Sequence, residues 1–135
     1  MIGTILAGSL TKNNHLDAGL DITSAEDCII GAGDSCLIST GLFINVPEGC
    51  VGLIWSRSGL SVKYRLEVGA GCIDSGYNGE VKVHLYNHGF ESYKVRVGDK
   101  IAQLLTIPVI LTEYVKVDYF QESDRGDKGF GSSGL

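Results

Sequence analysis

The apolar residues of this chain fall mostly in short runs that favour β-strands. Residues 37–46 (LISTGLFINV) are rich in β-branched side chains and end at a Pro-Glu-Gly turn. Residues 80–86 (EVKVHLY) alternate apolar and polar side chains, which is typical of a half-exposed strand. Residues 50–55 (CVGLIW) are apolar on both faces, which predicts a strand buried on both sides, and residues 100–111 (KIAQLLTIPVIL) predict another buried strand.

Three further segments complete the predicted elements. Residues 113–120 (EYVKVDYF) place apolar side chains at every second position, which predicts one more strand. Residues 58–64 (SGLSVKY) form the one predicted helix, and residues 69–83 (GAGCIDSGYNGEVKV) predict a glycine-rich hairpin. Short strands separated by glycine turns predict an all-β fold, either a closed barrel or a sandwich.

The C-terminal segment differs from the rest of the chain. Residues 124–135 (DRGDKGFGSSGL) are polar and lack apolar periodicity, so they cannot form a packed element of their own. The whole chain has 135 residues, which is the length of one domain. We therefore predict one β domain over residues 1–122 and a mobile arm over residues 123–135, carrying a single large aromatic residue, Phe130.

The composition restricts the possible partners. A net charge of −5 gives no general attraction to nucleic acid or acidic membranes, so we expect neither as a partner. The four cysteines form no C-x-x-C pair, which predicts reduced thiols packed as small apolar side chains. A basic signal-peptide start and an apolar run of about 18 residues are both missing, so we expect a soluble intracellular protein, cytoplasmic or, if viral, in the host cell.

Arg57 and Ser58 are candidate ligand-binding residues because they stand where the predicted helix begins. The first turn of a helix carries unpaired N–H groups and a partial positive charge. An arginine and a hydroxyl at that position are suited to binding phosphate. The alternative is that Ser58 caps the helix and Arg57 is an ordinary surface residue.

Asp74 and Tyr77 stand in the predicted hairpin. A carboxylate at its base can act as a general base, or it can form the turn by bonding to its own backbone. An aromatic residue in mid-turn either stacks on a planar ligand or covers the core. Asp21 and Gln103 are polar residues within apolar strands, so each is expected to have a specific partner.

Five segments, in order and spanning nearly the whole chain, resemble the motifs of the homotrimeric dUTP diphosphatases (dUTPases). They are AGLDITSA (18–25), WSRSGL (55–60), GAGCIDSGYNGEV (69–81), GDKIAQL (98–104) and RGDKGFGSSG (125–134). The resemblance implies a jelly-roll β-barrel, three subunits with active sites at their contacts, and Mg²⁺-dependent hydrolysis of dUTP to dUMP and pyrophosphate. That reaction keeps uracil out of DNA and supplies dUMP for thymidylate synthesis.

The resemblance also implies roles for individual residues. Asp74 matches the catalytic aspartate that activates the water attacking the α-phosphorus, and Asp21 matches an acidic residue near the water shell of the metal. Tyr77 matches the aromatic residue under the deoxyribose, where it leaves no space for a 2′-hydroxyl. The other implied substrate contacts are Arg57, Ser58, Gly59, Gly71, Cys72, Ile73, Lys82, Gln103, Arg125, Phe130 and Gly131.

These implied contacts divide the nucleotide among several segments. Residues 57–59 match the phosphate-binding motif, and Gln103 matches a residue at the α-phosphate. The backbone of residues 71–73 would pair with uracil. The C-terminal segment matches a mobile motif that closes over the nucleotide in the site of another subunit, with Phe130 stacked on uracil and Arg125 on the γ-phosphate.

Two positions depart from the commonest pattern of the family. Gly76 stands where many members have an acidic residue, and Cys72 stands where valine or leucine is usual. Two alternative functions are considered: a dCTP deaminase or bifunctional deaminase–diphosphatase of the same fold, and a nucleotide-sensing binding protein. A deaminase needs an acidic residue over the pyrimidine, whereas Glu80 is expected on the strand beyond the turn.

Overall fold

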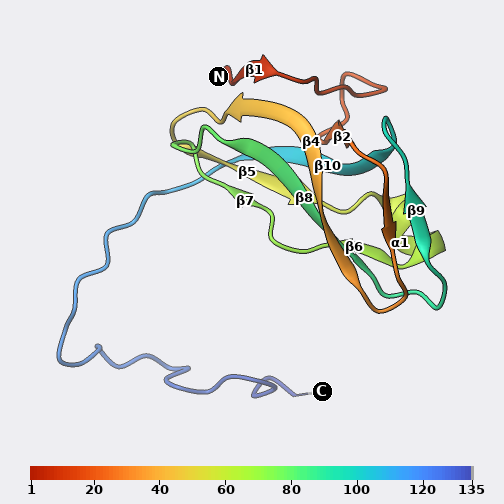
Figure 1. Ribbon diagram of the computed structural model, residues 1–135. Coiled ribbons are helices and arrows are strands. Elements are labelled where there is room, and N and C mark those ends of the chain that lie inside the picture. The colour runs from red at the N-terminus through yellow and green to blue at the C-terminus, as the bar shows by residue number, and fades with distance from the viewer. Residues whose placement is uncertain (135) are drawn as a thin grey trace.

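The computed structural model describes residues 1–134, which form ten short strands and one helix (Figure 1). The elements are β1 (Thr4–Ala7), β2 (Leu20–Thr23), β3 (Cys28–Ile30), β4 (Ser35–Asn45), β5 (Cys50–Trp55), α1 (Ser58–Tyr64), β6 (Leu66–Val68), β7 (Cys72–Ile73), β8 (Glu80–Asn87), β9 (Tyr93–Val95) and β10 (Lys100–Pro108). The predicted all-β class is confirmed.

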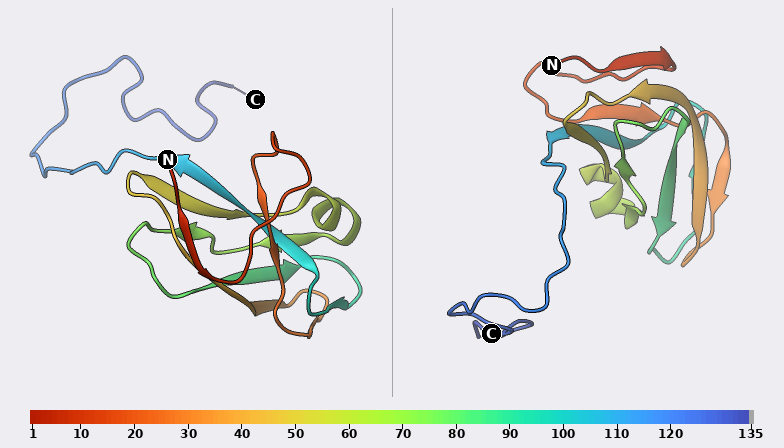
Figure 2. Two further views of the ribbon diagram at one scale, coloured as in Figure 1. Left: turned by 90° about the horizontal axis from the view of Figure 1, so that it is seen from above. Right: turned by 90° about the vertical axis from the view of Figure 1, so that its left-hand side faces the viewer.

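The strands form two four-stranded antiparallel sheets and a two-stranded ribbon. Sheet A has the order β1-β4-β8-β6, sheet B has the order β2-β10-β5-β7, and the ribbon pairs β3 with β9. The two sheets face one another (Figure 2). One core lies between them, to which Ile38 and Val83 of sheet A and Ile54 and Leu104 of sheet B contribute. The arrangement is jelly-roll-like, but within the described residues the two sheets do not join into one closed barrel.

Helix α1 begins and ends at the predicted residues. Arg57 precedes it in an extended conformation, and Arg65 ends it in the left-handed region with φ of 57°. Lys63 stands in the last turn, where a positive charge is favourable beside the helix C-terminus. The helix buries no side chain, and no helix within residues 1–134 is long and apolar enough to span a membrane.

Strand β5 also has its predicted bounds, but it is not buried on both faces. Cys50 and Ile54 point into the core, whereas Val51 and Leu53 are only half-buried and Trp55 is 58% exposed. The prediction was wrong because, within residues 1–134, the outward side chains of β5 remain half-buried or exposed and no second sheet packs on them. Trp55 instead lines a surface cavity described below.

The glycine-rich segment at residues 69–83 is not a hairpin. Strand β7 pairs with β5 in sheet B, whereas β8 pairs with β4 and β6 in sheet A. The segment therefore crosses from one sheet to the other, and residues 74–79 form what we call the β7–β8 loop. Glycine spacing predicted the turn correctly, but it cannot indicate which strands pair across it.

The predicted strand at residues 113–120 is missing from this protomer. Strand β10 ends at Pro108, and the chain then runs away from the body as an extended segment (Figure 1). The alternating side chains Val115, Val117 and Tyr119 are all exposed. The pattern needs a neighbouring strand and a covered face, and residues 1–134 supply neither. Leu135, the last residue of the predicted arm, lies outside the described residues.

Candidate active site

The register of sheet B brings residues from three motifs into one row. Asp21 of β2 is paired with Gln103 of β10, which is paired in turn with Trp55 of β5. Side chains alternate between the two faces of a strand, so these three share the outward face while Ile22 and Leu104 point into the core. Two predicted site residues that are far apart in the sequence, Asp21 and Gln103, are therefore neighbours.

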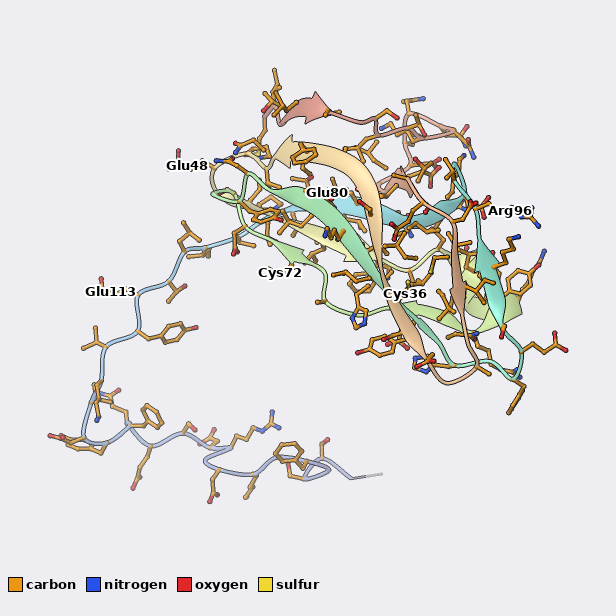
Figure 3. The ribbon with its side chains drawn as sticks, in the orientation of Figure 1. Cys36, Glu48, Cys72, Glu80, Arg96 and Glu113 are labelled. Carbon is orange, nitrogen blue, oxygen red and sulfur yellow. The ribbon has the colours of Figure 1, made fainter. Side chains whose placement is uncertain are left out.

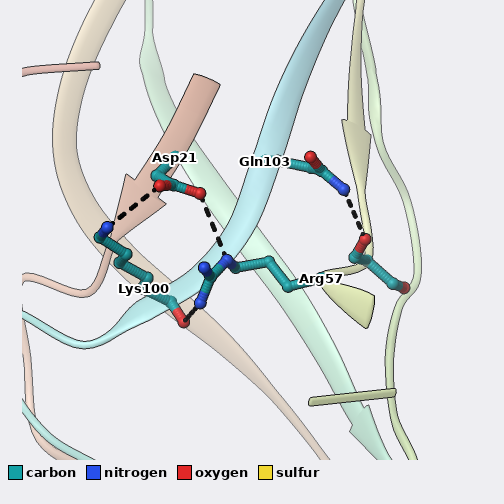
Figure 4. A network of polar contacts seen from close by, with 5 residues as sticks. Asp21, Arg57, Lys100 and Gln103 are labelled. Atoms are coloured by element: carbon teal, nitrogen blue, oxygen red, sulfur yellow. Dashed lines mark hydrogen bonds and ion pairs between the residues drawn. The ribbon is translucent and has the colours of Figure 1, made fainter. Parts of the chain in front are cut away.

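Asp21 holds two cations at this face (Figure 4). Its Oδ1 lies 3.2 Å from Arg57 Nε, and its Oδ2 lies 3.2 Å from Lys100 Nζ. The Asp21 side chain is only 12% exposed, whereas Arg57 and Lys100 are 33% and 39% exposed, so solvent screens the two ion pairs only in part. Arg57 was predicted from the sequence, but Lys100 was not, although it belongs to the GDKIAQL segment and could have been found there.

Gln103 also has the specific partner that its position required. Its Nε2 donates a hydrogen bond to the Ser56 backbone oxygen at 2.9 Å. A Cβ at position 19 would collide with the Gln103 carboxamide, so Gly19 leaves the space that this side chain occupies. The carboxamide is thus fixed beside the start of α1.

Asp21, Arg57 and Gln103 line a cavity of about 560 Å³ on the outward face of sheet B, here called the sheet B cavity. Ser58 and Gly59, the first residues of α1, form one wall. Arg57 is the N-cap, and no side chain caps the helix, so the interpretation of Ser58 as the cap is wrong. The cavity is also lined by Lys12, a cation that the sequence analysis missed.

The backbone closes the β7–β8 loop, and the Asp74 carboxylate does not. The Tyr77 N–H donates a hydrogen bond to the Asp74 backbone oxygen at 3.0 Å. The carboxylate is exposed and has one long contact, 4.0 Å from Cys72 Sγ to Asp74 Oδ1. It is therefore accessible to a ligand or a water molecule.

Tyr77 is fixed at one edge and open on the other. Its hydroxyl donates a hydrogen bond to the Glu80 backbone oxygen at 2.7 Å. Its ring lies so close to Gly79 that a Cβ there would be 2.6 Å from Tyr77 Cζ. Because the side chain is still 46% exposed, it offers a held aromatic surface and does not cover the core.

Strand β7 is the outer strand of sheet B and pairs there only with β5. Gly71, just before it, accepts a hydrogen bond from the Ile54 N–H at 2.8 Å. A Cβ at Gly71 would lie 2.6 Å from the Ile54 oxygen, so only glycine permits this approach. The other edge of β7 has no strand partner among residues 1–134, and its backbone groups can bind a planar ligand with complementary donors and acceptors.

The predicted site residues of the body fall into two cavities that share no lining residue. The second cavity, of about 350 Å³, is here called the loop cavity. The sheet B cavity is lined by Asp21, Arg57, Ser58, Gly59 and Gln103. The loop cavity is lined by Gly71, Cys72, Ile73, Asp74, Tyr77 and Lys82. The chain thus presents these residues as two separate surfaces.

The predicted residues of the arm lie in neither cavity. Arg125, Phe130 and Gly131 belong to the segment beyond β10 that runs away from the body (Figure 1). Arg125 Nε donates a hydrogen bond to the Lys128 oxygen at 2.7 Å, and the Phe130 ring is fully exposed. The structure therefore does not bring the arm together with the other site residues.

Glu80 is a residue of this site whose role the sequence analysis missed (Figure 3). Its Oε2 accepts hydrogen bonds from Ser39 Oγ and from the N–H groups of Thr40, at 3.2 Å, and Gly41, at 2.8 Å. These donors stand where β4 shifts register against β8. The Ser39 hydroxyl, followed by the Gly41 N–H, lowers the pKa of Glu80 below its ordinary value of 4.5. Glu80 thereby fixes the end of the β7–β8 loop to sheet A.

We expect Glu80→Gln to destabilise the protein at neutral pH and to reduce its sensitivity to acid. A lowered pKa means that the carboxylate stabilises the fold above 4.5, and that this contribution is lost as the pH falls through the folded-state pKa. The loss should be about 1 kcal/mol, because the carboxylate remains accessible to solvent.

Thermal unfolding of the Glu80→Gln variant, followed from neutral pH to below pH 4.5, measures both effects. Glu91→Gln is the matched control, since that side chain is exposed. An unchanged melting temperature in Glu80→Gln at neutral pH would show that the three hydrogen bonds do not stabilise the loop.

Comparison with known proteins identifies relatives of the chain. The dUTPase family model matches residues 7–134. A deoxyuridine 5′-triphosphate nucleotidohydrolase of Arabidopsis thaliana is 45% identical over 125 residues, which is 93% of this chain and 75% of the relative. One from Gloeothece citriformis is 45% identical over 132 residues, which is 96% of this chain and 91% of the relative.

Solved structures have the same fold. The dUTPase of Staphylococcus bacteriophage 80alpha with dUPNHPP has a TM-score of 0.91 and 32% identity, and the match covers 99% of both chains. A mutant dUTPase from phage phi11 of S. aureus, described with a structural Mg(II) ion, has a TM-score of 0.82 and 28% identity, covering 90% of this chain and 100% of that one.

Proposed function

The chain belongs to the dUTPase family, the deoxyuridine 5′-triphosphate nucleotidohydrolases, and we propose that its two cavities and its arm together bind dUTP for hydrolysis to dUMP and pyrophosphate. The division of the site residues carries this proposal. The cations Lys12 and Arg57 line the sheet B cavity, whereas Asp74, Tyr77 and strand β7 line the loop cavity. We propose that the sheet B cavity binds the triphosphate of dUTP and that the loop cavity binds its nucleoside.

Asp74 is the proposed general base. Its exposed carboxylate would orient the attacking water and accept its proton as the new bond to the α-phosphorus forms. A carboxylate is a weak base, but it suffices where nearby cations stabilise the negative charge that develops on the phosphoryl oxygens. The products of this attack are dUMP and pyrophosphate, so the enzyme would remove a precursor of uracil in DNA and supply dUMP for thymidylate synthesis.

Arg57, Ser58 and Gly59 are the proposed phosphate contacts, with Gln103 near the α-phosphate. Asp21 keeps Arg57 and Lys100 in place before the substrate arrives, so the cations need little reorganisation on binding. Apart from its chain neighbours and the backbone of its own helix, Gly59 has no atom within 4 Å of a Cβ built on it, so it is open to a close approach by a phosphate oxygen. A guanidinium can also bind two phosphate oxygens at once.

Mg²⁺ is proposed to arrive bound to the triphosphate. Magnesium ions keep several water ligands and readily take phosphate oxygens. Within residues 1–134, no three His, Cys, Asp or Glu side chains are grouped to hold a metal ion, and both oxygens of Asp21 are ion-paired. Asp21 would therefore accept a hydrogen bond from a metal-bound water. The bound ion would neutralise part of the phosphate charge.

The loop cavity is proposed to select deoxyuridine. The open backbone edge of residues 71–73 can form hydrogen bonds with uracil. Cytosine in the same place would leave a polar atom without a hydrogen-bond partner, which costs much of the binding free energy. Lys82 lines the same cavity. Tyr77 would pack under the deoxyribose and exclude a 2′-hydroxyl, because the Glu80 hydrogen bond and Gly79 fix its ring.

The hydrogen bonds of Glu80 count against the deaminase alternative. A deaminase needs an acidic side chain that is free to move protons over the pyrimidine. Glu80 lines the loop cavity, but its Oε2 already accepts three hydrogen bonds from β4. Its pKa is lowered, which disfavours the protonated form that such a shuttle uses.

A homotrimer is proposed to bring the separate parts of the site together. Three copies related by closed rotational symmetry would form three equal sites. The segment beyond β10 also needs a partner, because Ile110, Tyr114 and Phe120 are 90–91% exposed and bury nothing in their own protomer. We propose that residues 113–120 pair with a neighbouring protomer, and that residues 123–135 form the arm that closes on a site there.

Mixing two inactive variants tests this shared site. Asp74→Asn removes the base from the loop cavity, and Arg57→Ala removes a cation from the sheet B cavity. If each site combines one cavity from each of two protomers, random mixing restores about a quarter of the sites. The measurement is the rate of dUTP hydrolysis after the two variants are unfolded and refolded together.

Each variant refolded alone is the control and should stay inactive. Activity that does not recover on mixing would place the whole site within one protomer. Light scattering that gave a particle of 14.4 kDa, the mass of one chain, would also contradict the proposed trimer.

A further inference from the structure

Cys28 and Cys36 form a close thiol pair that the proposed reaction does not use. Their sulfur atoms are 2.7 Å apart, and the Cys28 S–H donates to Cys36 Sγ. Cys28 begins β3 and Cys36 is the second residue of β4, eight positions further along the chain. Figure 3 shows Cys36 on the strand β4.

Both thiols face inward and are held in place by their strands. Cys28 is two residues from the buried Ile30, and Cys36 is two residues from the buried Ile38, so each shares the inward face of its strand. Both pack against the core. Strand β3 is paired with β9 and strand β4 with β8, so backbone hydrogen bonds hold the strands that carry Cys28 and Cys36.

We propose that Cys28 and Cys36 form a redox pair that closes into an intramolecular disulfide by exchange with a small-molecule disulfide such as oxidised glutathione. A disulfide has a sulfur–sulfur distance of about 2.05 Å, so the two atoms need to approach by well under 1 Å. Both residues are only half-buried, so a small oxidant can reach them. Two protein thiols and one small disulfide give one protein disulfide and two small thiols.

The surroundings of the pair indicate the order of the two steps. Burial is the main cause that raises the pKa of Cys28 to about 12, and the hydrogen bond to Cys36 is the second. The Cys36 thiolate therefore attacks first, because thiolates are the reacting species; it forms a mixed disulfide and releases one small thiolate. Cys28 then loses its proton and attacks the Cys36 sulfur, which releases the second small thiolate.

The disulfide would stabilise the fold without entering the proposed site. It would join the β3–β9 ribbon to sheet A and restrict the unfolded chain. Neither cysteine lines the sheet B cavity or the loop cavity. We therefore expect the oxidised protein to melt higher than the reduced protein by about 4 °C or more.

Peptide mapping of the full chain after incubation with oxidised or reduced glutathione tests the pair. Asp34 lies between the two cysteines, so a protease that cleaves before aspartate separates their peptides unless a disulfide links them. We expect linked peptides in the oxidised sample alone, and neither linked peptides nor an oxidant-dependent melting shift in Cys28→Ser or Cys36→Ser. The Cys36→Ser variant assigns the link, because the peptide of residues 34–73 also contains Cys50 and Cys72.

Separated peptides in the oxidised wild-type chain would overturn the proposal, and this readout requires no variant to fold. Linked peptides with an unchanged melting temperature would refute the stabilising role. Both results are independent of dUTP hydrolysis, so a failure here is distinguishable from a failure of the proposed function.

Discussion

Asp74→Asn should abolish turnover while leaving nucleotide affinity nearly unchanged. The amide keeps the size and hydrogen bonding of the side chain, but it cannot accept the proton of the attacking water. Loss of a positioned general base typically lowers the rate by about 10²–10⁴. Affinity should persist, because the cations of the sheet B cavity and the edge of β7 are unchanged. Steady-state pyrophosphate release and equilibrium binding of a nonhydrolysable dUTP analogue measure the two effects.

Asp34→Asn is the matched control for this variant. Asp34 is an exposed aspartate in the connection from β3 to β4, and it lines neither cavity. The same substitution there should leave kcat and KM unaltered. If Asp74→Asn kept its activity within about threefold of the parent, Asp74 would be only a loop residue and the base would have to be found elsewhere.

Removal of the chain after Asp124 should leave the fold intact and collapse kcat. The truncation deletes Arg125, which is proposed to bind the γ-phosphate, and Phe130, which is proposed to stack on uracil. Stacking of an aromatic residue on a base contributes roughly 1–3 kcal/mol. The open site would also admit water, which weakens every electrostatic contact in it. Binding should weaken less than turnover, because both cavities remain and the arm acts most in the closed state.

Three measurements on truncated and full-length protein separate these effects: melting curves, analogue affinity and steady-state rates. The melting temperature should move little, since residues 125–134, the described part of the deleted segment, are exposed apart from the half-buried Gly129. Ser132→Ala is the control. It changes one side chain of the arm and leaves the arm in place, so it separates the effect of a substitution from the effect of deleting the arm. A truncated enzyme that hydrolyses dUTP at the full rate would show that the arm does not close the site.

Local patterns predicted the elements whose formation depends on their own residues. The bounds of α1 and β5 agree with the prediction, and alternation along β8 placed Val81, Val83 and Leu85 in the core. The prediction of a strand at residues 113–120 was wrong because a strand also depends on residues outside its own segment. Its alternating pattern describes a strand with one covered face, but a pattern cannot show whether the covering residues belong to the same protomer.

The contacts of the site depended on strand register, which a single sequence does not show. The ion pairs of Asp21 require β2 to lie beside β10 and Arg57 to turn back over both. The hydrogen bonds of Glu80 require the register shift in β4. The resemblance to the family supplied the predicted site residues, and the structure divides those of the body between two cavities.

Pyrophosphate release measured in parallel with dUTP, dCTP, dTTP and UTP tests the central claim most directly. The open edge of β7 and the held Tyr77 predict that dUTP is hydrolysed and that each of the others has a kcat/KM lower by at least about 100-fold. Comparable pyrophosphate release from UTP or dCTP, or release of ammonia from dCTP, would contradict the proposed selection of deoxyuridine by the loop cavity.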